Sequence, residues 1–218
     1  MPPVLRLYED IFASNAPGLR LPALPRMIFV VHGSVTVEGR SFGDGEAWHG
    51  EGTATLKPGL GGVTCWRFEL APADAPDGGI EGLGATSRQK LAASLDPLPK
   101  GNLLLRGDSV AFPPGGCAHL HRHQGPGIRC LIEGGIRIDT HGRSTSYGPG
   151  GAWYESGPDP VFAQAADRPT RFIRVMILPR ELLGKSSIQY VNEDDKTKPR
   201  SQQYKIFADA PIAFAATR

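Results

Sequence analysis

The sequence predicts an all-β fold of many short strands, and three observations support this class. Turn-forming residues are abundant, with 28 Gly and 20 Pro among 218 residues, which disfavours a helical bundle or coiled coil. Several short segments are rich in Val, Ile, Thr and Phe and are bounded by Gly, Pro or Asp. Parts of the first half of the chain also recur in the second half. Together these features indicate a β-sandwich or barrel.

The first half contains the clearest strand patterns. Residues 27–31 form an apolar run that ends at a predicted His32-Gly33 turn, and the alternating residues 34–38 complete a predicted hairpin. Two further strands are expected at residues 54–56 and 63–70, with the Gly-rich residues 57–62 between them. The loop-like residues 71–87 follow, and residues 87–95 are predicted to form a short helix capped by Ser87.

The second half returns to strand patterns. Predicted strands and the turns between them alternate as far as about residue 178, with strands expected at 102–106, 108–112, 127–132, 136–139, 161–165 and 171–178. Residues 192–200 are charged and are expected to form an exposed loop. Residues 204–207 are expected to add one more strand, and residues 212–214 a short apolar contact.

Three pairs of similar segments divide the chain into two β modules. Phe-Gly-Asp-Gly-Glu-Ala-Trp (42–48) resembles Tyr-Gly-Pro-Gly-Gly-Ala-Trp (147–153), and similar matches link residues 31–37 to 132–138 and residues 67–72 to 174–179. Because all three matches occur in the same order, we expect tandem modules. The predicted boundaries are residues 1–86, 87–180 and a C-terminal extension, 181–218, that packs on a module or on a partner subunit.

Composition excludes several classes of function. Lys and Arg number 24 against 22 Asp and Glu, so no basic surface for nucleic acid is expected. The sequence has no signal peptide pattern and no apolar run long enough to span a membrane. Three scattered cysteines form no disulfide framework. We therefore expect a cytoplasmic protein.

The motif that indicates chemistry is His-Leu-His-Arg-His at residues 119–123. Alternate residues of a strand point to one face, so His119, His121 and His123 are expected to project together. Imidazoles placed in this way can share one divalent metal ion. Two other interpretations stay open. The histidines could form a metal-free polar pocket that binds substrate or transfers protons, or they could be structural.

Residues around this motif resemble the cupin family. Gly115, the five residues after it, His121-Arg122-His123 and the later Gly134 are similar to the first cupin motif, and the tandem modules resemble a bicupin. The resemblance covers residues 24 to 179. It implies two double-stranded β-helix (jelly-roll) modules and one divalent metal ion per chain, either iron, manganese, nickel or zinc, in the C-terminal module.

The sequence departs from the family pattern at two ligand positions. The usual metal-binding Glu after the His-X-His motif is replaced by Gly127, and no His occurs in the segment that resembles the second motif, where Val161 or Tyr154 takes the place of the ligand. His119 or Glu155 is therefore expected to complete a shell begun by His121 and His123.

Three further residues are candidates for contact with a substrate, and no catalytic residue is assigned. They are Arg129, Tyr154 and Gln124. Arg129 shares a strand face with Gly127, so its side chain could point into the barrel and bind a carboxylate. The sequence pattern is equally compatible with an outward orientation.

The resemblance implies a metal-binding protein that is an enzyme for a small metabolite, with dioxygenase-, isomerase- or hydrolase-like chemistry. The alternative is a non-catalytic binding or sensor protein with a degenerate metal site. A small-molecule ligand and a homodimer are expected, the latter because exposed sheet edges need covering.

Overall fold

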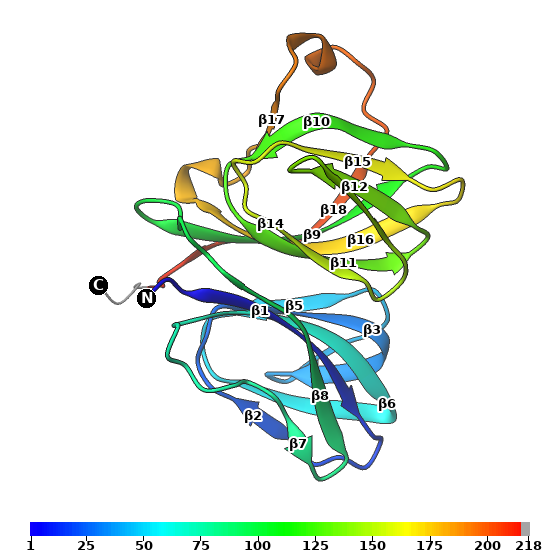
Figure 1. Ribbon diagram of the computed structural model, residues 1–218. Coiled ribbons are helices and arrows are strands. Elements are labelled where there is room, and N and C mark those ends of the chain that lie inside the picture. Colours follow the sequence, from blue (N-terminus) through cyan, green and yellow to red (C-terminus); the bar gives the residue numbers. More distant parts are fainter. Residues whose placement is uncertain (215–218) are drawn as a thin grey trace. The chain divides into compact units, whose positions relative to one another are not determined.

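The computed structural model describes residues 1–214, and these form antiparallel strands with two short 3₁₀ turns and no α-helix (Figure 1). No helix among these residues has the length and apolar character needed to cross a membrane. The predicted all-β class is therefore correct. Residues 215–218, the last part of the predicted C-terminal extension, lie outside the described residues.

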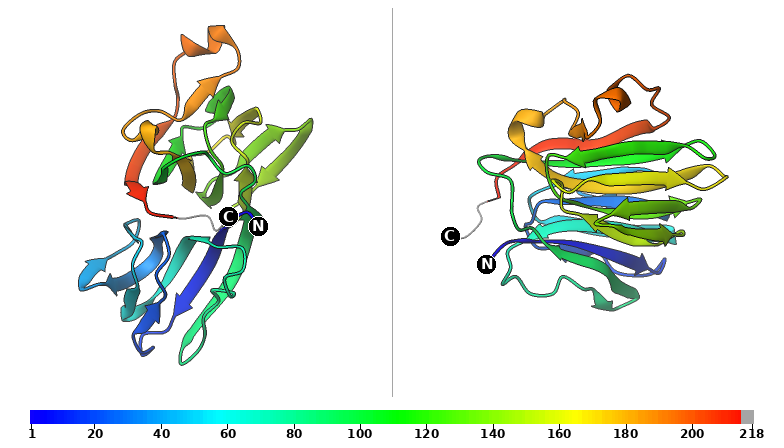
Figure 2. Two further views of the ribbon diagram at one scale, coloured as in Figure 1. Left: turned by 90° about the vertical axis from the view of Figure 1, so that its left-hand side faces the viewer. Right: turned by 45° about the horizontal axis from the view of Figure 1, so that its top comes forward.

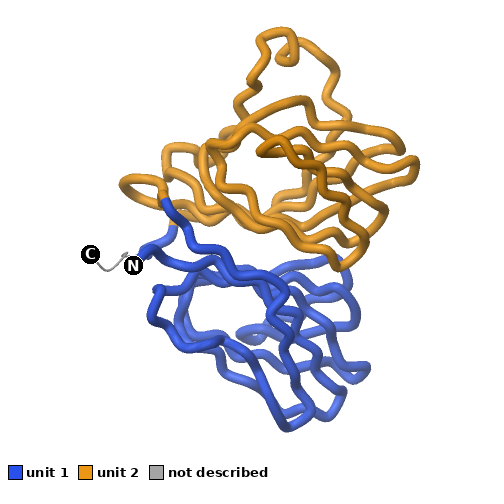
Figure 3. Tube along the Cα trace, viewed as in Figure 1, with its two compact units in different colours: residues 1–96, 212–218 blue, residues 97–211 orange. Residues whose placement is uncertain are grey.

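The chain divides into two compact units (Figure 3). Unit 1 comprises Met1–Asp96 and the chain from Ile212 onward, and unit 2 comprises Pro97–Pro211. The division between them lies after Asp96, ten residues beyond the position that the sequence predicted. The extra segment stays with unit 1 because its strand pairs along the whole of the first strand of that unit.

Unit 1 is built on one eight-stranded sheet. Its central order is β4-β3-β6-β1-β8-β7, with β2 beside β6 and β5 beside β3. The strands are β1 (Val4–Phe12), β2 (Leu19–Leu21), β3 (Arg26–Val37), β4 (Arg40–Phe42), β5 (Ala47–Gly50), β6 (Ala54–Ala71), β7 (Glu81–Gly82) and β8 (Ala85–Ser94).

Three local predictions for unit 1 were wrong. The His32-Gly33 turn does not exist, because β3 runs through it with irregular pairing against β6 on both sides. β6 likewise continues through residues 57–62. Residues 87–95 are not a helix, since β8 occupies this segment and pairs with β1. The first strand, β1, was missed.

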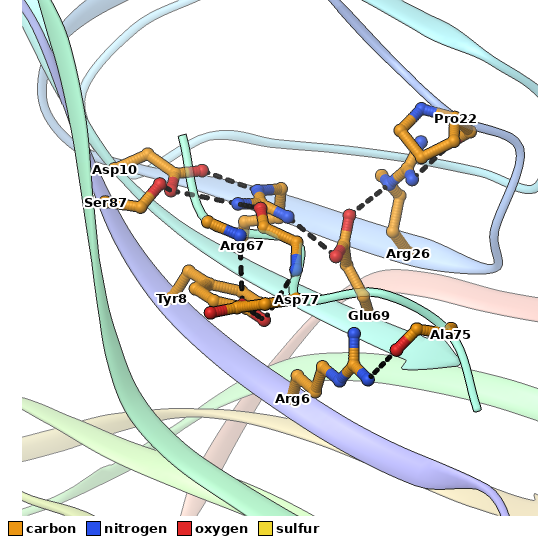
Figure 4. Close-up of polar contacts among 12 residues, drawn as sticks. Arg6, Tyr8, Asp10, Pro22, Arg26, Arg67, Glu69, Ala75, Asp77 and Ser87 are labelled. Carbon is orange, nitrogen blue, oxygen red and sulfur yellow. Dashed lines mark hydrogen bonds and ion pairs between the residues drawn. The ribbon is translucent and has the colours of Figure 1, made fainter. Parts of the chain in front are cut away.

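A connected group of buried charges lies on β1, β3 and β6 (Figure 4). Arg67 donates to both oxygens of Asp10 (2.6 and 3.1 Å) and forms an ion pair with Glu69 at 2.6 Å. Glu69 in turn accepts a hydrogen bond of 2.9 Å from Arg26. These four side chains are almost fully buried, so each charge depends on its partners for neutralisation.

Unit 2 contains two five-stranded sheets, of orders β13-β12-β15-β10-β17 and β14-β11-β16-β9-β18. Figure 2 shows their strands from two further directions. The elements are β9 (Leu103–Phe112), β10 (Cys117–His123), β11 (Gly127–Glu133), β12 (Ile136–Thr140), β13 (Arg143–Tyr147), β14 (Ala152–Glu155), β15 (Val161–Ala165), β16 (Thr170–Pro179), η1 (Arg180–Leu182), β17 (Ile188–Tyr190), η2 (Glu193–Lys196) and β18 (Gln203–Ile212).

The segment after β16 adds one strand to each sheet of unit 2. β17 pairs with β10, and β18 lies beside β9. The predicted strand at 204–207 is thus part of a longer strand. As a result, β9 and β10 each have a strand on both sides.

An apolar core fills part of the space inside unit 2. It is formed by buried side chains of both sheets, among them Val110, Phe112, Ile138, Val161 and Phe172. The aromatic ring of Trp153 packs edge-on against Phe172, with ring centroids 5.2 Å apart. Polar residues continue this inner surface, and the candidate site lies among them.

Candidate functional site

A small cavity lies inside unit 2, where the apolar core meets polar residues. Its volume is about 20 Å³, which is room for one water molecule or one ion. Both sheets and the C-terminal segment contribute to its wall. The polar lining residues are His121, His123, Arg129, Trp153, Glu155, Arg174, Gln202 and Tyr204.

A local irregularity in β10 decides which histidines face this cavity. The pairing of β10 with β15 shifts between Ala118 and His121, so the alternation of faces is interrupted there. Ala118, His121 and His123 all line the cavity. His119 instead lies near Asp195, with its Nδ1 atom 3.9 Å from the carboxylate. The structure brings together two of the three expected imidazoles.

His121 and His123 present ring nitrogens to each other. Their Nε2 atoms are 3.2 Å apart, and His121 Nδ1 lies 2.7 Å from the carbonyl oxygen of His119. A proton on Nδ1 that is donated to this carbonyl leaves the lone pair of His121 on Nε2. Burial lowers the pKa of both imidazoles, and the Arg129 cation lowers that of His123 further. Both rings are therefore neutral at neutral pH and available as ligands.

Glu155 lies beside the histidine pair and is held by two other side chains. Its Oε2 atom is 3.4 Å from His123 Nε2 and 2.8 Å from Arg129 Nη2. Trp153 Nε1 donates a hydrogen bond of 2.8 Å to Oε1 of the same carboxylate. Arg129 therefore points into the barrel. Burial lowers its pKa to about 10, while the charge of Glu155 opposes this shift.

The backbone at Gly127 leaves no room for a side chain. A Cβ atom there would lie 2.4 Å from the carbonyl oxygen of Val175 and 3.0 Å from Met176 Cα. Glu155 pairs directly across the sheet from Gly127, so a carboxylate reaches this region from the neighbouring strand. Val161, opposite His121 on β15, adds an apolar wall.

The other two predicted substrate contacts lie away from the cavity. Tyr154 sits between the lining residues Trp153 and Glu155 on β14, so its side chain points to the opposite face. Gln124 lines a separate, open depression of about 300 Å³, to which His123 also contributes.

Four polar lining residues were not among the predicted site residues: Trp153, Arg174, Gln202 and Tyr204. Arg174 was predicted only as part of the repeated segment 174–179, and Tyr204 only as part of the added strand at 204–207. Arg174 makes two hydrogen bonds to Asp108 (2.9 and 2.7 Å) and lines the cavity. Nothing in the sequence pattern of residues 171–178 distinguishes an arginine that lines a cavity from one with a structural role.

The residues around the cavity fit a divalent metal ion in part. Two nitrogens 3.2 Å apart can bind one ion at about 2.0–2.1 Å each, so the histidine pair fits as two ligands. Glu155 is the nearest carboxylate, but it would have to exchange its contact with Arg129 for the metal. No group of three or more His, Cys, Asp or Glu side chains within residues 1–214 is arranged to hold an ion. The fit is therefore that of a two-histidine centre.

Comparison with known proteins identifies the fold. No family model and no curated protein matches the sequence. The Lactobacillus farciminis oxalate decarboxylase formate complex is similar over 91% of this chain and 82% of its own, with 13% identity and a TM-score of 0.58. The salicylate 1,2-dioxygenase from Pseudaminobacter salicylatoxidans is similar over 79% of this chain and 70% of its own, with 12% identity and a TM-score of 0.54.

A third similar structure carries the name of the fold. The cupin 2 conserved barrel domain protein from Leptotrichia buccalis matches 81% of this chain and 85% of its own, with 10% identity and a TM-score of 0.50. This chain therefore has a cupin-type fold. At these identities the similarity extends to the fold alone, and function has to be argued from the site.

Proposed function

We propose that this protein binds one divalent metal ion per chain at His121 and His123 and is an enzyme that acts on a small molecule. The observation that carries the proposal is the pair of buried imidazoles whose Nε2 atoms lie 3.2 Å apart at the cavity of unit 2. Iron, manganese, nickel and zinc all accept imidazole ligands.

A bound ion would supply Lewis-acid or oxygen-binding chemistry, and the residues around it have distinct tasks. His121 and His123 would hold the ion through Nε2. Arg129 keeps the Glu155 carboxylate 3.4 Å from His123, where it would orient a bound molecule. The carboxylate would become a third ligand only by exchanging its contact with Arg129 for the metal. The apolar side chains of Val161 and Phe172 limit the access of water. The reaction belongs to a dioxygenase-, isomerase- or hydrolase-like class.

The proposal includes the architecture of the whole protein. Each compact unit corresponds to one cupin module, and unit 2 alone carries the site. The protein works in the cytoplasm as a homodimer. Its substrate is a small molecule, and neither nucleic acid nor a membrane is a partner.

The test is the metal content of the purified, untagged protein by elemental mass spectrometry. We expect one of the four metals at close to one ion per chain, and its loss in a His121→Ala/His123→Ala variant. A His32→Ala/His49→Ala variant is the matched control, because it removes two histidines of unit 1 and should keep the metal. Absence of metal in the native protein, even after reconstitution with these ions, would contradict the proposal.

A non-catalytic small-molecule-binding or sensor protein is the second candidate. The ion pair between Arg129 and Glu155 favours this second function. Glu155 is the only carboxylate in the described lining of the cavity, and its contact with Arg129 keeps it from binding a metal. A metal-free protein that still binds small molecules would support this function. Turnover that depends on the metal would exclude it.

A further inference from the structure

A second and larger cavity in unit 2 lies next to the histidine site. Its volume is about 270 Å³, and it is bounded by β9, β16 and the segment from Gly184 to Asp209. Arg174, Ile188 and Tyr204 line both cavities, so the two cavities adjoin at these side chains. Typical small-molecule sites measure roughly 300–1,000 Å³, so this volume suits a small ligand.

The lining of this larger cavity contains four basic and two acidic side chains. Two of the basic groups are neutralised by the two acids. Arg174 forms two hydrogen bonds to Asp108, and Arg106 forms an ion pair of 2.9 Å with Asp209. Arg106 also donates to the carbonyl oxygens of Lys185 and Leu182, both at 2.7 Å, so each of its three nitrogens makes a hydrogen bond within the protein.

The other two basic groups, Lys185 and Arg200, have no carboxylate partner among residues 1–214. Arg200 lies over the ring of Tyr190 at 5.7 Å, which fixes the guanidinium without neutralising it. Apolar surface adjoins them, because Ile188, Ile206 and the Tyr204 ring line the same cavity. The cavity thus combines excess positive charge with an apolar wall.

We propose that this cavity binds a small organic carboxylate. Lys185 and Arg200 supply the charge that recognises the carboxylate group, and Ile188, Ile206 and Tyr204 contact its apolar part. Arginine and lysine both favour carboxylates, and arginine adds a directional pair of donors. This binding needs no metal ion at the histidine pair, so it goes beyond the function proposed above and can be tested separately.

The test measures binding by calorimetry with matched acids and amides: phenylacetate against phenylacetamide, and hexanoate against hexanamide. Each amide keeps the apolar part and removes the charge. We expect at least one acid to bind with a Kd below about 10 mM and at least about tenfold more tightly than its amide. Inorganic phosphate, which has charge and no apolar part, is expected to bind more weakly than that acid.

A double variant and a control locate the site. A Lys185→Gln/Arg200→Gln variant should weaken binding of the acid at least about tenfold. These side chains are exposed, so the fold should persist, which a thermal melt checks. Lys205→Gln is the control, because Lys205 is an exposed lysine of the same strand as Tyr204 outside the cavity lining and should leave Kd unchanged.

The His121→Ala/His123→Ala variant separates this proposal from the metal proposal. Carboxylate binding should persist in this variant even if metal is lost. The proposal is overturned if no acid binds below about 10 mM, if the amides or phosphate bind equally well, or if the Lys185/Arg200 variant binds like the native protein. Loss of binding in a folded histidine variant would place the carboxylate at the histidine pair and would also overturn it.

Discussion

At the candidate site of unit 2, two residues on neighbouring strands have different roles, one in backbone packing and one in supplying a carboxylate. Gly127 has no space for a side chain, and Glu155 brings a carboxylate to the same region from β14. The close contact between β11 and β16 at Gly127 therefore lies directly beside the Glu155 carboxylate. The absence of a side chain at residue 127 is therefore a packing requirement of β11 and β16.

The first prediction concerns Gly127→Ala. A new Cβ would meet the backbone of β16 at 2.4 Å, so the strands must shift, and we expect a loss of about 1–3 kcal/mol in the free energy of unfolding. Urea denaturation measures the change. Gly148→Ala is the control, since a Cβ at Gly148 would meet no atom within 4 Å. Equal stabilities for the two variants would refute this packing argument.

At the residue scale the sequence predicted part of the cavity lining, while metal binding by these residues stays a prediction. His121 and His123 were found because alternate positions of a strand share a face, and Glu155 was found as the nearest carboxylate. His119 was wrongly placed with them because the irregular pairing between Ala118 and His121 depends on contacts with β15, which lie in another part of the chain. The direction of Arg129 was likewise set by its contacts with Glu155 and with the Gly127 carbonyl oxygen.

Among the elements of unit 1, strands β1, β3 and β6 are joined by charges as well as by backbone hydrogen bonds. Arg67 on β6 contacts Asp10 on β1, and Glu69 links it to Arg26 on β3. Ser87 on β8 adds a hydrogen bond to Asp10. One buried group therefore fixes the relative positions of four strands.

The second prediction is that Arg67→Met destabilises the protein by about 3–5 kcal/mol, because Asp10 and part of the Glu69 charge would be left buried without a partner. Chemical denaturation again measures the effect. Arg88→Met is the matched control, since Arg88 pairs with Glu9 at an exposed position and should cost less than about 1 kcal/mol. A loss at Arg67 no larger than that at Arg88 would contradict the prediction.

The third prediction concerns pH and Tyr8. Burial raises the pKa of the Tyr8 phenol above its ordinary value of 10.0, and its hydrogen bond to Asp77 raises it further. The folded state therefore holds this proton more tightly than the unfolded state, so the contribution of Tyr8 to stability is present below pH 10 and decreases above it.

Absorbance at 295 nm tests this prediction, because it reports ionised tyrosine. The difference between native protein and Tyr8→Phe should titrate above pH 10 in the folded state. Tyr154→Phe is a useful comparison, since burial also raises the pKa of Tyr154, but this side chain has no hydrogen bond to a carboxylate among those described. A Tyr8 titration at or below 10 would show that the phenol is solvated.

Sequence patterns located most strands but not their continuity. Residues 161–165 were predicted with the bounds that the structure has. Residues 87–95 include Gln, Lys, Leu and Ala, which favour helix, yet pairing with β1 imposed a strand. β1 itself was missed because its inward positions include Arg6, Tyr8 and Asp10, whose burial depends on residues more than fifty positions away.

At the scale of the whole molecule, the division of the chain does not follow the order of its residues. Unit 1 takes residues from both ends of the described chain, and the segment after β16 serves unit 2 up to Pro211. The internal repeat predicted two β modules, but it carried no information about the extension, which has no counterpart in the first half. The extension joins both sheets of unit 2, because β9 and β10 each have a free edge that β18 and β17 cover.

The fourth prediction is that a chain ending before Gln203 associates with itself. Without β18, the edge of β9 would be exposed and Arg106 would lose Asp209. We expect a lower melting temperature and larger particles in light scattering. Asp209→Asn is the control, because it removes the charge partner while β18 still covers the edge, so it should lower stability without association. An unchanged particle size in the shortened chain would contradict this prediction.

The late position of β18 has a consequence for synthesis on the ribosome. All eight strands of unit 1 are translated before the first strand of unit 2, so their sheet can form while the nascent chain is still growing. β9, in contrast, is translated about a hundred residues before its partner β18. During that interval β9 has an unpaired edge, and a chaperone that binds extended segments would find its target there.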